Sequence, residues 1–159
     1  MIGRLFHRRR EPCLSLELSN VWEIDAPADV ATFVRALPQL LPPQSGLVLE
    51  NTAFAKDAAA VLKQHCVPNH PRLARGTIFP RSRQFYVALS VCGPLAETLE
   101  RHATPEVCDH FHAFAPDRVL LEWWDASCGD QWHLSGTFSK QEVDSYCGPL
   151  GCKYTWLGA

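Results

Sequence analysis

Two neighbouring segments with the alternation typical of β-strands constrain the fold of this 159-residue chain more than any other feature. Residues 118–125 place large side chains on both faces of such a strand, whereas residues 131–138 alternate apolar with polar side chains. A short loop containing Ser127, Gly129 and Asp130 separates them. Two alternating runs joined in this way predict an antiparallel hairpin. A hairpin excludes an all-parallel sheet, whose consecutive strands need a crossover connection.

Helical and strand patterns continue along the rest of the chain. Short runs of β-forming residues predict strands within residues 14–24, where a turn joins two of them, and within 46–50, 85–91 and 154–157. Apolar residues at helical spacing, preceded by a capping residue or a Gly-Pro pair, predict helices. These helices are expected to begin near Asp25, Thr52, Gly93, Thr104 and Ser139.

The last two expected helices have specific start signals. Ser139 is followed three residues later by Glu142, which is the pattern of a capping box. Thr104 precedes a proline, and the apolar residues that follow, Phe111 and Phe114 among them, would share one side of a helix. We therefore expect helices over residues 139–147 and 104–114.

Alternating helices and strands predict the α/β class, with α+β as the alternative. The length suits one domain, so residues 13–159 are expected to form a single globular unit. This unit would contain a mixed sheet, with the antiparallel hairpin at 118–138 and helices packed on it. Residues 1–12 carry Arg4, Arg8, Arg9 and Arg10 and are expected to be a flexible, basic tail.

The sequence predicts a cytoplasmic location. The basic N-terminus is not followed by the apolar run of a secretory signal. The longest uncharged stretch, residues 36–49, is interrupted by prolines and is too short to span a membrane. Seven cysteines, an odd number, cannot all pair within the chain, which favours reduced thiols.

Charge is divided unevenly along the chain. Residues 1–83 hold 11 Lys and Arg against 7 Asp and Glu, whereas residues 84–159 hold 4 against 10. The acidic second half argues against nucleic acid as a partner, because phosphate binding needs a continuous basic surface. It favours a protein partner with a basic surface.

Four tryptophans lie in the acidic last third of the chain, and Trp124 stands beside Asp125 and close to Asp130. An exposed aromatic residue flanked by acids is typical of a protein-binding patch. Arg72 and Arg75, in an arginine-rich loop, could contact the same or another partner. These five residues are the candidate partner-binding residues. We expect a non-catalytic interaction or regulatory module that needs no cofactor.

Two alternative functions remain open. The chain has no phosphate loop, dinucleotide glycine pattern, nucleophile elbow or HExxH motif. However, the hairpin would place Glu122 on the same face as His133, within cross-strand or diagonal reach, and such a pair can act in acid–base catalysis. In the second alternative, a structural zinc ion binds Cys66, His70, Cys108 and His112.

Overall fold

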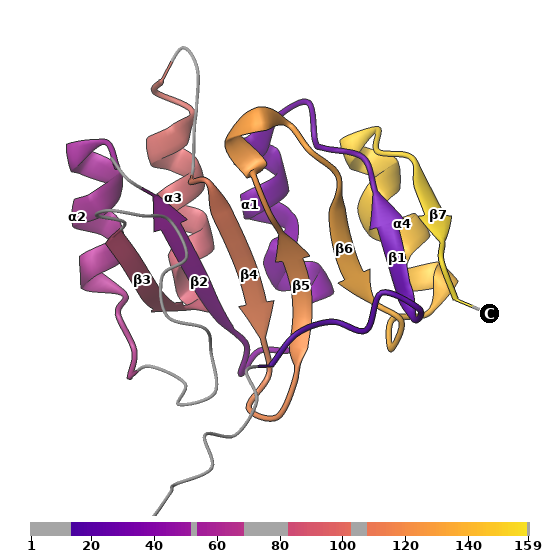
Figure 1. Ribbon diagram of the computed structural model, residues 1–159. Helices are drawn as coiled ribbons and strands as arrows, with labels where there is room; N and C mark the ends of the chain where they lie inside the picture. The colour runs from indigo at the N-terminus through magenta and orange to yellow at the C-terminus, as the bar shows by residue number, and fades with distance from the viewer. Residues whose placement is uncertain (1–13, 52–53, 69–82, 103–107, 159) are drawn as a thin grey trace, which may run out of the picture.

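The computed structural model describes residues 14–51, 54–68, 83–102 and 108–158. They form one domain around a seven-stranded sheet in the order β3-β2-β4-β5-β6-β1-β7 (Figure 1). The strands are β1 (Val21–Ile24), β2 (Gly46–Asn51), β3 (Arg83–Ala88), β4 (His110–Phe114), β5 (Val119–Trp123), β6 (Trp132–Ser135) and β7 (Tyr154–Trp156). The strand pairings among the described residues are antiparallel. The α/β class and the antiparallel hairpin at 118–138 are confirmed. The described strands pair antiparallel, whereas a mixed sheet was expected.

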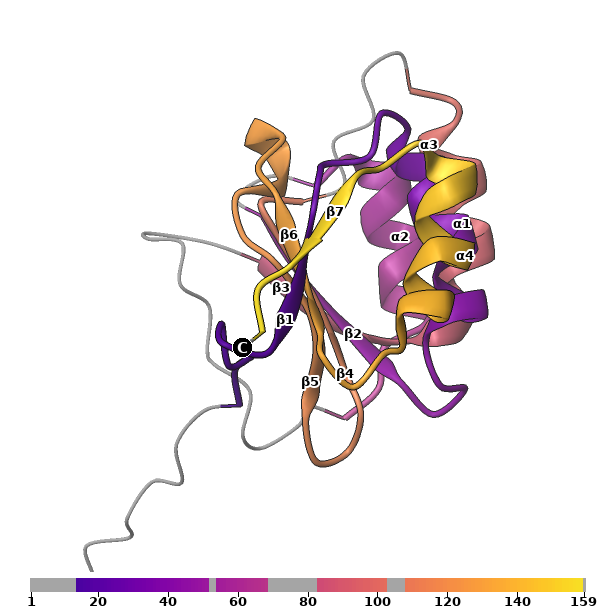
Figure 2. The same ribbon diagram turned by 90° about the vertical axis from the view of Figure 1, so that its right-hand side faces the viewer.

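The α-helices of the described residues lie together on one side of this sheet (Figure 2). They are α1 (Val30–Leu40), α2 (Lys56–Gln64), α3 (Cys92–Leu99), which follows the short 3-10 helix Leu89–Val91, and α4 (Lys140–Leu150). The domain is therefore a two-layer structure, in which one face of the sheet is covered by helices. We call the other face the open face. No described helix is both long and apolar enough to cross a membrane.

Aromatic packing fixes the helix layer to the sheet. Phe33 of α1 meets Trp123 at 5.1 Å and Trp132 at 5.4 Å between ring centroids, in both cases edge to face. The Phe111 ring centroid lies 5.7 Å from that of Phe33. The Tyr146 hydroxyl donates to the Phe33 carbonyl oxygen at 3.0 Å. Edge-to-face pairs add to the free energy of area burial. This cluster joins α1 and α4 to the three central strands.

Residues 110–114 were expected to end a helix, but they form β4, one of the three central strands. Phe111 opposes Leu49 of β2 on one side and Trp123 of β5 on the other. Phe111 and Phe114 are three residues apart, which places them on one side of a helix but on opposite faces of a strand. Phe111 indeed joins the main core, whereas Phe114 packs with Val48 in a separate cluster.

Two further differences lie near the start of the chain. Residues 14–20 contain no strand, and they cross the open face in front of β5 (Figure 1). Helix α1 is capped by Asp29, whose carboxylate accepts from the Ala31 N–H at 3.0 Å, instead of by Asp25. The Asp25 N–H donates to the Lys153 carbonyl oxygen at 3.0 Å. The capping box of Ser139 and Glu142 is present as expected at the start of α4.

Candidate functional site

A row of alternating carboxylates and imidazoles crosses the open face. His133 of β6 stands between Glu23 of β1 and Glu122 of β5, each of which it opposes in register. Glu122 in turn opposes His112 of β4. Side chains at directly opposed positions point to the same face of a sheet. Four adjacent strands therefore bring two acids and two histidines into one line, although they come from distant parts of the sequence.

The predicted neighbours Glu122 and His133 are brought together by this register, but His133 contacts another acid more closely. Its Nε2 lies 3.6 Å from a carboxylate oxygen of Glu23, and both of these side chains are partly exposed. Between Glu122 and His133, the described contacts include no direct ion pair, only a longer-range attraction. The arrangement is thus a shared histidine between two acids, and not an isolated acid–base pair.

Glu122 is the more buried acid of this row, with 8% of its surface exposed. Burial raises the pKa of its carboxyl group above the usual 4.5, because the charged form loses its hydration. The Leu16 N–H, which donates to Oε1 at 3.3 Å, and the Trp124 side chain act in the opposite direction. Residues 14–20 therefore cover this carboxyl group as they cross the face.

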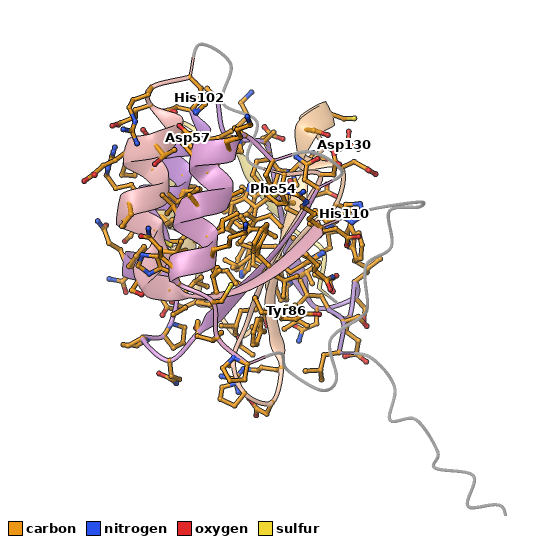
Figure 3. The ribbon with its side chains drawn as sticks, turned by 90° about the vertical axis from the view of Figure 1, so that its left-hand side faces the viewer. Phe54, Asp57, Tyr86, His102, His110 and Asp130 are labelled. Carbon is orange, nitrogen blue, oxygen red and sulfur yellow. The ribbon has the colours of Figure 1, made fainter. Side chains whose placement is uncertain are left out.

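A second pair of acid and histidine lies next to the row. Glu50 of β2 opposes His110 of β4, and its Oε2 is 3.6 Å from the His110 Nδ1. The other imidazole nitrogen, Nε2, is 3.7 Å from a carboxylate oxygen of Asp125. Figure 3 shows His110 on the side of the sheet away from the helices. Both ring nitrogens of His110 therefore face acids.

Trp124 covers the two histidines of β4. Its ring centroid is 4.4 Å from that of His112 and 4.8 Å from that of His110, and both contacts are edge to face. The Nδ1 atom of His112 is buried and has no hydrogen-bond partner among the described residues. Burial, together with the nearby His110, lowers the pKa of His112 to about 4. His112 is therefore neutral at physiological pH.

The predicted partner-binding residues of the C-terminal third lie at the rim of this site. Trp124 remains 39% exposed, and the Asp125 side chain is 63% exposed. Asp125 adopts a left-handed backbone conformation with φ 50°, which is uncommon outside glycine. Asp130 is exposed and lies on the same side of the sheet as His110 (Figure 3). Arg72 and Arg75 fall outside the described residues.

The loop that presents these acids is held at both ends. The Trp123 indole N–H donates to the Asp130 carbonyl oxygen at 2.8 Å. The Ser127 hydroxyl donates to the Asp109 carboxylate at 2.7 Å, and the Ala126 N–H donates to the Asp109 carbonyl at 2.7 Å. The acidic rim is therefore preorganised by contacts that come from β5 and from the residue before β4.

Known proteins offer no guide to this site. Comparison with protein-family models, curated proteins and solved structures finds no match. The function must therefore be argued from the geometry.

The predicted zinc ligands are only partly described. Cys66 is exposed beside β3, where it forms an isolated bridge with Val87, and Cys108 is buried just before β4. Burial raises the pKa of the Cys108 thiol well above 9.0, which disfavours the thiolate that binds zinc. His112 lies on the open face, and His70 is outside the described residues. Among the residues described, no cluster of three His, Cys, Asp or Glu could hold a metal. Zinc binding stays a prediction, which metal analysis of the purified chain tests.

Sequence reasoning missed Glu23, Glu50 and His110. Interpreting residues 104–114 as a helix hid His110, because the alternation of His110 and His112 with apolar residues is meaningful only in a strand. Glu23 interrupts a short apolar run, which is the same signal that identified Glu122, and Glu50 ends such a run. That signal could have found them. Which histidine each acid meets depends on the strand order.

Proposed function

We propose that this chain is a protein-interaction module that binds a basic, arginine-containing segment of a partner protein on its open face. The observation that carries the proposal is the setting of Trp124. This large ring is partly exposed, stands over two histidines and is next to the acidic rim of Asp125 and Asp130. Partly exposed tryptophans surrounded by polar groups are typical of residues that dominate binding energy.

The charge of the open face supports a cationic partner. Glu23 is partly exposed on this face and Asp125 is exposed at its rim, whereas Glu50 and Glu122 are buried within it. His112 is neutral at physiological pH and does not offset these charges. An arginine guanidinium can stack on an indole while it donates to nearby carboxylates. This combination distinguishes an arginine-rich segment from a lysine-rich one.

An acid–base enzyme that uses Glu122 and His133 is the second candidate. The cross-strand register of the two residues and the raised pKa of Glu122 favour it. A catalytic pair also needs a concave site for the substrate. Neither residue lines the pocket at Leu40 and Tyr146 or the pocket at Gly46 and Phe114. His133 moreover contacts Glu23 more closely than Glu122. We therefore rank this candidate second.

The test is a calorimetric titration of the chain with a ten-residue probe peptide of alternating arginine and serine, at low and at physiological salt. We expect binding that weakens as salt rises, because rim charges act through screened electrostatics. Trp124→Ala should weaken it about 30-fold, as expected for a residue that contributes about 2 kcal/mol. Asp125→Asn combined with Asp130→Asn should mainly reduce the salt dependence.

Matched controls separate this site from general acidity. Trp156 has the same 39% exposure as Trp124, and Asp117 is an exposed acid in the turn between β4 and β5. Trp156→Ala and Asp117→Asn should leave the affinity unchanged. Asparagine suits the left-handed conformation at position 125, so that substitution preserves the loop. Equal losses in the control variants, or equal binding of an aspartate–serine peptide, would refute the proposal.

A further inference from the structure

Ser90 and His65 meet at the β3 edge of the sheet, away from the carboxylate and histidine row. The Ser90 Oγ lies 3.2 Å from the His65 Nδ1. Ser90 follows β3 directly, within the 3-10 helix Leu89–Val91 that continues into α3. His65 caps the C-terminus of α2. A serine hydroxyl in contact with an imidazole nitrogen is the minimal arrangement for nucleophilic catalysis by serine.

Backbone hydrogen bonds hold the two residues in place. The Ala88 N–H donates to the His65 carbonyl oxygen at 3.0 Å, and the Val67 N–H donates to the Tyr86 carbonyl at 2.9 Å. The segment after α2 is thereby attached along β3. Main-chain pairing therefore holds the backbones of the two residues close together, and their side chains meet at the surface.

Ser90 also lines a pocket of about 460 Å³. The remaining lining is mostly apolar: Pro43, Gln44, Ser45, Gly46, Val67, Ala88, Leu89 and Phe114. Ser45 is a second hydroxyl in this lining, and its Oγ is buried without a hydrogen-bond partner among the described residues. A volume of this size suits a small organic ligand. An unpartnered buried hydroxyl can donate to a ligand oxygen at little further cost, because its own desolvation has already occurred.

Gly46 and Phe114 shape this pocket. A Cβ atom at Gly46 would lie 2.5 Å from the Phe114 Cζ, so the ring packs directly on the glycine backbone. Phe114 also joins Val48 and Tyr86 in the small apolar cluster of the open face. The apolar wall beside Ser90 is thus fixed by close packing, which favours an apolar acyl group as the part of a ligand that contacts it.

We propose that Ser90 and His65 form a nucleophile and general-base pair that hydrolyses small carboxylic esters bound in this pocket. Ser90 Oγ attacks the ester carbonyl carbon, and its proton moves to His65 Nδ1. The tetrahedral intermediate expels the alcohol, which takes the proton from His65, and leaves an acyl group on Ser90. Water, deprotonated by the same imidazole, then releases the carboxylic acid and restores the serine.

The carbonyl oxygen needs donors while it carries negative charge. The Ser45 hydroxyl lines the pocket and is buried without a hydrogen-bond partner among the described residues, so it can donate to this oxygen. This activity does not depend on the proposed binding of a basic segment, because it uses other residues.

The test is covalent labelling of the full-length chain with a fluorophosphonate probe, followed by mass spectrometry of the labelled peptide. We expect one adduct, on Ser90. Ser90→Ala should abolish the adduct. His65→Gln should slow its formation about 100-fold, because a general base contributes at least that much.

The controls use residues with similar surroundings. Ser127 is a serine with a carboxylate partner, and His102 is a histidine whose Nε2 lies 3.1 Å from Asp57 on the helix layer (Figure 3). Ser127→Ala and His102→Gln should leave labelling of Ser90 unchanged. Hydrolysis of p-nitrophenyl butyrate should follow the labelling rates. Absence of an adduct in the folded chain, or an adduct that forms equally fast in His65→Gln, would overturn the proposal.

Discussion

The two faces of the sheet are built from the same strands but serve different purposes. In β5, Leu121 and Trp123 point to the helices and are at most 2% exposed, whereas Glu122 points to the open face. The helix-covered face is almost entirely apolar, and its burial stabilises the fold. The open face carries carboxylates and histidines, some of them buried at a cost in free energy. Because these carboxylates and histidines do not stabilise the fold, we infer that the open face is the face that binds a partner.

The largest expected effect tests the helix-covered face. Phe33→Ala removes the ring that contacts four aromatic residues of that core, so we expect a loss of about 3–5 kcal/mol in the free energy of unfolding. Trp124→Ala on the open face should lose clearly less, because its ring is partly exposed. Urea denaturation of both variants measures the difference. Equal losses would break the distinction between the two faces.

A smaller effect is expected where the open face is tightly packed. In Gly46→Ala the new methyl group would collide with the Phe114 ring, so we expect a loss of about 1–3 kcal/mol. Gly93→Ala is the control, because it lies in α3 with no atom within 4 Å of the added carbon. Since alanine is favoured in helices, the control should be neutral or slightly stabilising. Thermal unfolding of the two variants, compared with the unchanged chain, is sufficient.

Acid should weaken the domain through His112. Its pKa is about 4 in the folded chain but 6.5 ordinarily, so the unfolded chain binds the proton first. Stability is therefore lost as the pH falls from 6.5 towards 4, by on the order of 1 kcal/mol for this partly exposed ring. The neutral variant His112→Gln should lose less over the same range. If denaturation at pH 7 and 4.5 shows the same loss in both chains, His112 is not the cause.

Two glutamates should respond to pH with opposite signs. Burial raises the pKa of Glu122 on the open face, so its ionisation costs stability as the pH rises above 4.5. The capping box lowers the pKa of Glu142 on α4, so its contribution is present above 4.5 and is lost as the pH falls. Relative to the unchanged chain, Glu122→Gln should gain, and Glu142→Gln should lose, roughly 0.5 kcal/mol at pH 7. Denaturation at pH 4 and 7 checks both signs.

The helix-covered face was largely readable from the sequence, because apolar periodicity reports burial directly. The hairpin of β5 and β6, with the neighbours Glu122 and His133, followed from alternation alone. The start of α4 followed from its capping box. The central strand β4 was mistaken for a helix, because the spacing of Phe111 and Phe114 fits one side of a helix. Local periodicity could not resolve this ambiguity.

The open face was less readable, because its composition depends on which strands are neighbours. Glu23 and His133 are 110 residues apart in sequence, and their contact exists only because β1 lies beside β6. The same holds for Glu50 and His110, which come from β2 and β4. Individual acids within apolar runs can be recognised, but their partners depend on long-range pairing that leaves no local signal.

The most direct test of the open face as the binding face is a two-dimensional ¹H–¹⁵N NMR titration with the arginine–serine peptide. Our account predicts that the shifted signals belong to β4, β5, β6 and the loop around Asp125, with the indole N–H of Trp124 among the largest changes. Signals of α1, α3 and α4 should stay in place. If the shifts instead cluster on the helices, or if the Trp124 indole does not respond, the open face is not the binding face.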